Sequence, residues 1–464
     1  MEEIKVEIIS KEDIKPSSPT PSHLRTFKHS ILDQVFPYPY TIIILFYTSH
    51  NLSEFPKRLE LLKQSLSETL THFYPLGGRI KDDLSIDCND ECANFVVTKI
   101  NCPITKILSK PDIYSLEKFL PVSISQRKSI RDHVINIQVN VFDCGGIAIG
   151  FCISHRILDA DSLSTFLKVW TERINQNCNL KPLTKPNFET ISLFPTSTLH
   201  FRDVSKKLWG SALKETKWIT RRFLFTNSTI ATLKAQILEN HHPTRVEIVS
   251  ALLWKFFMAA SKAHSETQKP SLVTHAVNLR KRMDESLRPE NSIGNFLWFS
   301  IAKHMDEHES SLDELVSKLK KSIQQVDKHL DARFQSDHEE GSSIIEDGLR
   351  NRLSKTRVEA LERLALNSWC NFEFYDAYLT YVVMQLLIQD LLTQGCTRSS
   401  SSLHFLSPAI HPSSRSSICA HSRSSRRLTV MTENNSNSHD SDDDGVDVMK
   451  TTARSESIRL GEAV

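Results

Sequence analysis

Residues 147–162 read IAIGFCISHRILDADS, and this stretch decides how the chain is interpreted. From Ile147 to Ile153, large apolar residues alternate with small ones, which predicts a strand that packs closely on both faces. The strand runs directly into His155, and Asp159 follows four residues later. Apolar residues then recur at helical spacing from Leu163 to Ile174, so a helix is expected to begin at once.

The imidazole of His155 at the end of a buried strand is suited to general-base work on a hydroxyl or an amine, because it titrates near neutral pH. Loops at strand ends are also frequent locations for active sites. The His-x-x-x-Asp spacing is weak by itself, since this chain contains 19 histidines. By itself it favours the alternative, a histidine that only forms hydrogen bonds in a partly buried turn.

The pattern on both sides of this stretch predicts two halves, each of mixed strands and helices. Residues 176–216 lose periodicity and carry three prolines, which is typical of a long crossover between the halves. Strands are predicted at 4–9, 41–47, 135–141, 147–153, 272–279, 296–302 and 367–375. Helices are predicted at 59–73, 163–174, 227–239, 246–261, 311–334 and 344–364.

The overall composition excludes several classes of protein. The chain has 464 residues with 57 basic and 55 acidic side chains. This balance gives no overall positive potential that would attract nucleic acid or an anionic membrane. No apolar run reaches the ~18 residues of a membrane-spanning helix. The acidic first residues do not resemble a secretory signal. We therefore expect a cytoplasmic protein with neither a nucleic-acid nor a membrane partner.

The nine cysteines are scattered and include no Cys-x-x-Cys. Cys88 and Cys92 are four residues apart, but no second Cys/His pair at zinc-finger spacing accompanies them. Reduced thiols are therefore expected, and no metal site is predicted.

Several separated motifs occur in a specific order. They are YPLGGR (74–79), CND (88–90), SHRILDA (154–160), SALLWK (250–255), VNLR (277–280), GNF (294–296) and NSWCNF (367–372). Together they resemble the BAHD acyl-CoA-dependent acyltransferases of plants, over about residues 1–377. The Asp159-Ala160 ending, in place of Asp-Gly, is similar to the branch that includes vinorine synthase. This context reverses the interpretation of His155, which now becomes the candidate catalytic base.

The resemblance implies a mixed α/β fold of two similar chloramphenicol-acetyltransferase-like domains, with a solvent channel between them. The halves would be residues 1–176 and 217–377, joined by a crossover at 177–216. The implied reaction moves an acyl group, with acetyl-CoA as the default donor, to a small-molecule alcohol or amine. His155 would remove the acceptor's proton, and direct attack on the thioester would need no acyl-enzyme. No permanently bound cofactor is implied, and relatives act mainly as monomers.

The resemblance also assigns roles to residues far from His155. Asp159 would point away from the site and pair with Arg280, fixing the loop. Ser368 and Trp369 would line the site opposite the histidine, although a buried tryptophan is more often packing. Asn295 would lie near the domain interface. Lys255 would approach the phosphates of CoA, but a lysine on an amphipathic helix is usually just solvated.

The chain departs from the family pattern after Ala377, because the expected DFGWG segment occurs nowhere. Residues 378–464 match nothing recognisable in the family. Between residues 399 and 425, 12 of 27 residues are serine, so this tail is predicted to be largely disordered and unable to complete the second sheet. Only Tyr378–Leu392 is apolar enough to form a helix or strand. The alternative function is therefore a catalytically impaired product that retains at most ligand binding.

Two further alternatives remain weaker. A peptide-bond-forming condensation domain shares the His-x-x-x-Asp core, but no carrier domain adjoins it here. The arginines between residues 415 and 427 could contact nucleic acid, but a solvated basic stretch explains them better.

Overall fold

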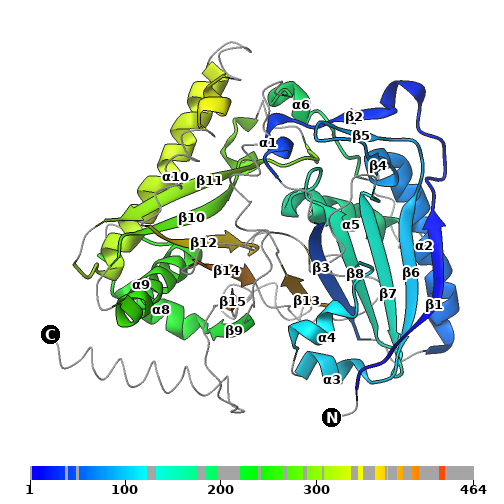
Figure 1. Ribbon diagram of the computed structural model, residues 1–464, viewed down its shortest axis with the longest axis horizontal. Helices are drawn as coiled ribbons and strands as arrows, with labels where there is room; N and C mark the ends of the chain where they lie inside the picture. Colours follow the sequence, from blue (N-terminus) through cyan, green and yellow to red (C-terminus); the bar gives the residue numbers. More distant parts are fainter. Residues whose placement is uncertain are drawn as a thin grey trace, which may run out of the picture.

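The chain forms two halves, each built around a six-stranded sheet (Figure 1). A third sheet contains β2 (Thr26–Lys28), β5 (Ser85–Asp87) and β4 (Arg79–Ile80). The computed structural model describes residues 3–36, 40–48, 52–109, 111–122, 132–174, 184–196, 220–238, 242–265, 269–285, 290–305, 308–335, 343–348, 361–370, 372, 374, 384–389, 400–406 and 428–433. The predicted crossover at 177–216 lies mostly outside the described residues.

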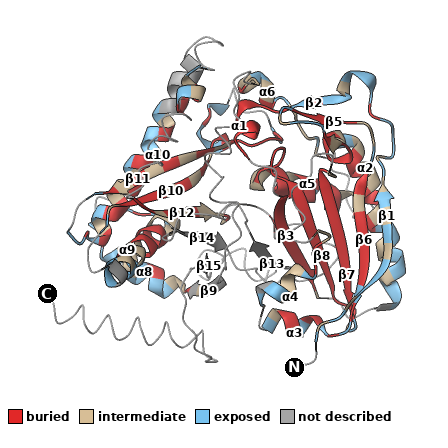
Figure 2. Ribbon diagram, in the orientation of Figure 1, coloured by how far each residue is buried: buried red, intermediate tan, exposed pale blue. Residues whose placement is uncertain are grey.

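The N-terminal sheet has the order β1-β6-β7-β8-β3-β13 and mixes parallel with antiparallel pairing. Its strands are β1 (Val6–Ile14), β6 (Ala93–Ile100), β7 (Ile135–Phe142), β8 (Ile147–Ser154), β3 (Tyr40–Tyr47) and β13 (Met384–Gln389). Every residue of β3 is buried, because alternate side chains enter separate hydrophobic clusters on the two faces of the sheet (Figure 2).

Helices cover both faces of this sheet. α2 (Phe55–His72) and α5 (Ala160–Ile174) supply side chains to one cluster, and α3 (Ile104–Ser109) to the other. The remaining short helices and turns of this half are α1 (Ile31–Gln34), α4 (Ile113–Glu117), α6 (Thr190–Leu193), η1 (Ser22–Leu24), η2 (Leu52–Glu54) and η3 (Tyr74–Gly77).

β8 is buried along its whole length, as the alternation of large and small residues predicts. A Cβ placed on Gly150 would lie 2.1 Å from the carbonyl oxygen of Phe119, so a larger residue there would collide with backbone. This close packing fixes the end of β8 and therefore the start of the loop that carries His155.

The C-terminal sheet has the order β11-β10-β12-β14-β15-β9. Its strands are β11 (Leu297–His304), β10 (Ser271–Asn278), β12 (Glu362–Ser368), β14 (Ser400–Leu406), β15 (Leu428–Glu433) and β9 (Thr220–Phe225). The helices α8 (Asn227–Ala235), α9 (Arg245–Ser265) and α10 (Leu312–Gln335) pack with it, and η5 (Arg280–Arg282) follows β10. The two halves thus share one style, and the mixed α/β prediction is confirmed.

Two sequence predictions about the C-terminal half were wrong. β12 begins at Glu362, inside the predicted helix 344–364 and ahead of the predicted strand 367–375. Leu364 and Leu366 alternate into the core, and their backbone pairs in parallel with β10. The apolar residues at the end of this charged segment are too few to distinguish helical spacing from the alternation of a strand.

The second wrong prediction concerns the serine-rich part of the tail. β13, by contrast, lies within residues 378–392, the segment expected to be able to form a helix or strand. β13 pairs with β3, while β14 pairs with β12 and with β15, so segments of residues 378–464 extend both sheets. β14 falls within the serine-rich stretch that was expected to supply no sheet. An exposed strand edge can form backbone hydrogen bonds with an extended segment whatever its side chains are. The amino-acid composition of the tail therefore did not predict this pairing. The rest of the tail lies outside the described residues.

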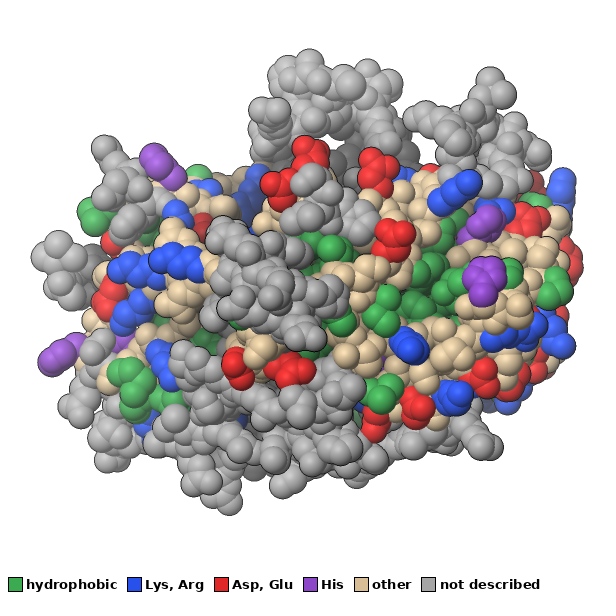
Figure 3. Space-filling model, turned by 90° about the horizontal axis from the view of Figure 1, so that it is seen from above, with side chains coloured by type: hydrophobic (Ala, Val, Ile, Leu, Met, Phe, Trp, Pro, Cys, Tyr) green, Lys and Arg blue, Asp and Glu red, His purple; other side chains and the backbone are tan. Residues whose placement is uncertain are grey.

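The described surface is consistent with the balanced charge of the chain. Acidic and basic side chains are interspersed over the face seen in Figure 3, without a large region of a single sign. Among the described residues, no helix combines the length and the apolar character that a membrane crossing requires.

Candidate active site

His155 lies in the turn that follows β8, with its side chain in the interior. Its relative exposure is 6%, and its ring stacks on Phe36 with centroids 4.3 Å apart and planes 7° from parallel. The backbone N–H of Ser154 donates to the carbonyl of Val134 at 2.9 Å, which fixes the approach to the turn. Within the described part of the chain, the Nδ1 atom of His155 has no hydrogen-bond partner. The ring is therefore held by stacking and by its own backbone.

Both oxygens of the Asp159 carboxylate accept hydrogen bonds from groups other than His155. Its Oδ1 accepts from the backbone N–H of Ser162 at 2.9 Å and so caps α5. Its Oδ2 accepts from Nη1 of Arg280 at 2.6 Å and from the backbone N–H of Phe296 at 3.0 Å. No hydrogen bond joins this carboxylate to the ring of His155 among the described residues. The predicted contact of Asp159 with Arg280 is present, and it is buried.

Arg280 gathers the segments around Asp159. Its Nε donates to Oγ of Ser292 at 3.0 Å, and its Nη2 donates to Oγ of Ser162 at 2.9 Å. Nη2 also reaches the carbonyls of Ser292 and Gly294, at 3.1 and 3.0 Å. The guanidinium lies 4.4 Å from the ring centre of Phe296. One buried cation thus joins the C-terminal half to the first turn of α5 in the N-terminal half.

Asn295 is fully buried and connects the halves directly beneath the histidine. Its backbone N–H and its Nδ2 both donate to Oδ1 of Asp33, each at 2.8 Å. The same Nδ2 donates to the carbonyl oxygen of His155 at 2.6 Å. Gly294 precedes it with a φ of +137°, a conformation that favours glycine. The predicted interface residue therefore holds the peptide of the catalytic candidate.

Asp33 was missed by the sequence analysis. It forms a capping box with Ser30 at the start of α1, and burial raises the pKa of its carboxyl against the opposing effect of hydrogen bonds from Ser30 and Asn295. The Ser-x-x-Asp spacing could have indicated the cap. No sequence signal could have indicated the contact with Asn295, because 262 positions separate the two residues.

The Ser-Trp segment lies at the end of β12. Trp369 is 5% exposed and packs with the apolar core of the N-terminal half, although β12 belongs to the other half. Its ring stacks on Phe374 with centroids 5.3 Å apart. Its indole Nε1 is buried with no hydrogen-bond partner in the described part of the molecule. Ser368, the last residue of β12, is partly buried.

Lys255 is placed apart from these contacts. It lies on α9, is 30% exposed, and makes an ion pair with Glu309 at 3.4 Å. None of the contacts described for it involves His155, Asp159 or Asn295. Its approach to CoA phosphates stays a prediction.

Comparison with known proteins explains this arrangement. A protein-family model described as the Transferase family matches residues 4–379, most of the chain. The chain belongs to the BAHD acyltransferase family. It is 37% identical over 386 residues to epi-neemfruitin B 7-O-acetyltransferase from Melia azedarach, covering 80% of this chain and 84% of that protein. It is 34% identical over 419 residues to (13S,14R)-1,13-dihydroxy-N-methylcanadine 13-O-acetyltransferase from Papaver somniferum, covering 80% and 86%.

Solved structures agree with this BAHD assignment. The crystal structure of vinorine synthase is similar, with a TM-score of 0.72 and 26% identity, covering 92% of this chain and 94% of that one. F. sporotrichioides TRI101, complexed with coenzyme A and T-2, has a TM-score of 0.62 at 16% identity over 88% and 94%, which shows the fold alone. This BAHD protein is an acyltransferase that uses acyl-CoA and a small-molecule acceptor. The alternative of an impaired product is not favoured.

Proposed function

We propose that the chain transfers an acetyl group from acetyl-CoA to a hydroxyl group of a plant specialised metabolite, with His155 as the general base. Support for acetyl comes from relatives named as O-acetyltransferases, including salutaridinol 7-O-acetyltransferase from Papaver somniferum, 38% identical over 62% of this chain and 65% of that protein. Alkaloid and limonoid alcohols are the acceptor classes to test first. An amine acceptor is the second choice.

The proposal rests mainly on the environment of the His155 side chain. Its ring is buried, stacked on Phe36, and free of a carboxylate partner at Nδ1 among the described residues. Its carbonyl is held by Asn295 from the opposite half of the molecule. A fixed imidazole that is not already committed to an ion pair can accept a proton from a bound hydroxyl.

The chemistry follows as a direct transfer. His155 takes the hydroxyl proton while the acceptor oxygen bonds to the thioester carbonyl carbon. The carbon–sulfur bond of the tetrahedral intermediate then breaks, and the CoA thiolate leaves with the proton from the imidazolium. The indole N–H of Trp369 has no partner and is the candidate donor to the oxyanion, beside Ser368.

Asp159 and Arg280 have a positioning role in this proposal. Their buried contacts reach the first turn of α5, Ser292 and the peptides on both sides of Asn295. The pair thus sets the loop geometry without contacting the reacting atoms. Lys255 is proposed as a CoA-phosphate contact. We also propose that the halves are residues 1–176 and 217–377, joined by a crossover at 177–216, with β13 added to the first half and β14 and β15 to the second. We further propose that the protein is a cytoplasmic monomer.

The test measures release of CoA thiol by the full chain from acetyl-CoA, with a panel of alkaloid and limonoid alcohols. His155→Ala is expected to lower kcat by about 10²–10⁴-fold, as for loss of a general base. The exposed His23→Ala is the matched control and should leave kcat unchanged. Wild-type turnover by the His155 variant would contradict the assigned base. A chain that gains thermal stability with CoA but turns over no acceptor would instead support the impaired alternative.

A further inference from the structure

Three potential metal ligands meet at the end of the N-terminal sheet where β7 starts and β8 ends, and no hydrogen bond or ion pair described for them involves the ring of His155. Asp13 lies near the end of β1, Cys92 immediately precedes β6, and His133 lies two residues before β7. β1, β6 and β7 are neighbours, and β1 runs antiparallel to β6 while β7 runs parallel to it. The end of one strand and the starts of two others therefore coincide, which brings together residues 13, 92 and 133.

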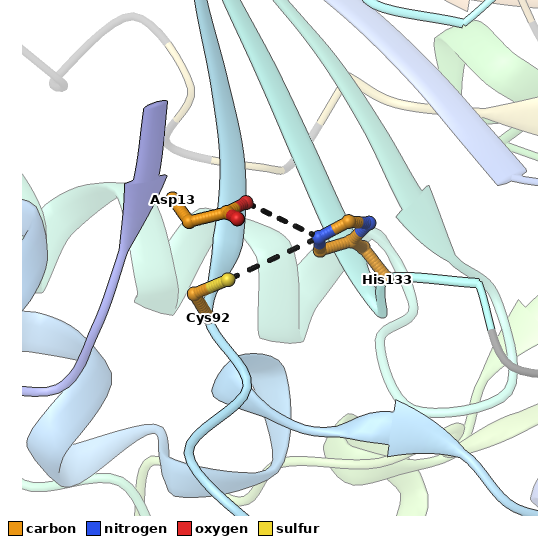
Figure 4. A group of neighbouring side chains, drawn as sticks. All are labelled: Asp13, Cys92 and His133. Atoms are coloured by element: carbon orange, nitrogen blue, oxygen red, sulfur yellow. Dashed lines mark hydrogen bonds and ion pairs between the residues drawn. The ribbon is translucent and has the colours of Figure 1, made fainter. Parts of the chain in front are cut away.

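The three donor atoms converge on one point. Oδ1 of Asp13 lies 3.5 Å from Nε2 of His133, and Sγ of Cys92 lies 4.0 Å from the same nitrogen (Figure 4). All three atoms are within 4.8 Å of one another. Tetrahedral Zn²⁺ with bonds of about 2.0–2.3 Å separates its ligand atoms by roughly 3.3–3.6 Å. Closing the site would therefore require the ligand atoms to approach one another by up to about 1.3 Å.

The same geometry argues against a nucleophilic triad. In a triad the histidine uses one nitrogen for the nucleophile and the other for the carboxylate. Here the thiol and the carboxylate both approach Nε2 (Figure 4). Convergence of sulfur, nitrogen and oxygen on one point instead matches the donor set of a borderline-soft divalent cation.

The surroundings hold two of the ligands in place. Cys92 adopts a φ of 96°, and its N–H donates to the carbonyl of Gly77 at 2.9 Å. His133 forms an isolated bridge with Arg79, whose guanidinium pairs with Glu91 at 2.9 Å. A carboxylate and a thiolate would supply two negative charges, which balance those of a divalent ion.

We propose that Asp13, Cys92 and His133 form a Zn²⁺ site that clamps the end of β1 to the starts of β6 and β7. Binding would replace the thiol proton, so Zn²⁺ and the thiol give a Zn–thiolate bond and one released proton. Water would occupy the fourth position. Three protein ligands leave this site more open than a four-ligand structural zinc site. We assign it a structural role because the ion would tie the edge strand β1 to the interior of the sheet.

The test uses Co²⁺ as the optical probe, added to the full chain after treatment with a chelator. One equivalent is expected to produce a thiolate-to-cobalt charge-transfer band and the intense visible bands of tetrahedral cobalt, both abolished by one equivalent of Zn²⁺. Cys92→Ser and His133→Gln should lose these bands. Cys88→Ser is the matched control, since Cys88 is equally buried and lies outside the three donors. It should keep them.

Absence of the charge-transfer band in the folded wild type, or its survival in Cys92→Ser, would overturn the proposal. Asp13→Asn separates loss of the metal site from loss of folding, because Asp13 is 63% exposed and its replacement leaves the core intact. This variant should fold as the wild type does and bind Co²⁺ about tenfold or more weakly. Undiminished affinity in that variant would also contradict the site. None of these measurements depends on transferase activity.

Discussion

Replacing Asp159 by asparagine removes one charge from a buried ion pair and puts an NH2 group in place of Oδ2, the oxygen that accepts from Arg280 and from the backbone N–H of Phe296. The side chains of Asp159 and Arg280 are 1% and 9% exposed, and their atoms approach to 2.6 Å. Asparagine keeps an oxygen that can accept from the N–H of Ser162, so the cap of α5 survives. The guanidinium is left buried with neutral partners and with Asp161, whose Oδ2 lies 3.7 Å from Nη1.

The magnitude follows from the burial. Breaking a buried pair by removing one partner costs about 3–5 kcal/mol, because an uncompensated charge stays out of water. Asp161 supplies partial compensation, but the N–H of Phe296 loses its acceptor, so we expect a loss of about 4 kcal/mol for Asp159→Asn. Alanine also loses the helix cap, worth about 1 kcal/mol. Asp159→Ala should therefore cost about 5 kcal/mol.

The assay is urea unfolding followed by circular dichroism, paired with CoA release. Asp161→Asn is the matched control, since the same change two positions away affects a side chain that is 31% exposed. It should cost at most about 1 kcal/mol. In a double-mutant cycle, adding Arg280→Met to Asp159→Asn should cost less than the sum of the single changes, because the stranded charge is gone.

Two results would refute this reasoning. An inactive Asp159→Asn protein with wild-type stability and CoA binding would mean that the carboxylate acts in the chemistry. Equal destabilisation by Asp159→Asn and Asp161→Asn would mean that burial of the first pair does not control the energy.

Three further predictions concern pH, backbone and the site. Burial, and to a smaller extent the charge of Arg156, lowers the pKa of His29 from 6.5 to about 3. The folded state therefore favours the neutral ring. The contribution of this group to the unfolding free energy is fully present above pH 6.5 and is lost as the pH falls toward 3. His29→Gln should reduce the slope of the unfolding free energy against pH, between pH 6 and 4, by up to about 1.4 kcal/mol per pH unit. Urea unfolding across that pH range measures this slope. Gly294→Ala should lower the unfolding temperature sharply, because its φ is +137° and its Cβ would lie 2.6 Å from Oγ1 of Thr190; an unchanged transition in a thermal scan would contradict this. Trp369→Phe keeps an aromatic ring but removes the unpartnered N–H, so kcat should fall while KM for acetyl-CoA and thermal stability stay near wild type; steady-state kinetics with a thermal scan checks this.

The sequence was informative where local pattern decides structure. The alternation of large and small residues in β8 predicted a strand buried on both faces, and its direct passage into SHRILDA located His155 at a strand end. The order of short motifs predicted the family and the contact between Asp159 and Arg280. The sequence alone could not assign residues 361–368 or the tail, because strand pairing depends on which edges are available elsewhere.

Tertiary structure decided which distant residues share one point in space. Asn295 reaches both Asp33 and the carbonyl of His155. Trp369 follows β12 of the C-terminal sheet but packs into the core of the N-terminal half. The convergence of Asp13, Cys92 and His133 is equally invisible in the sequence, where only a lone Cys-x-x-x-Cys spacing was considered. Periodicity reports which face of an element is buried. Contacts between elements depend on sheet order, strand direction and the closing of one half on the other, and these are set by packing of the whole chain.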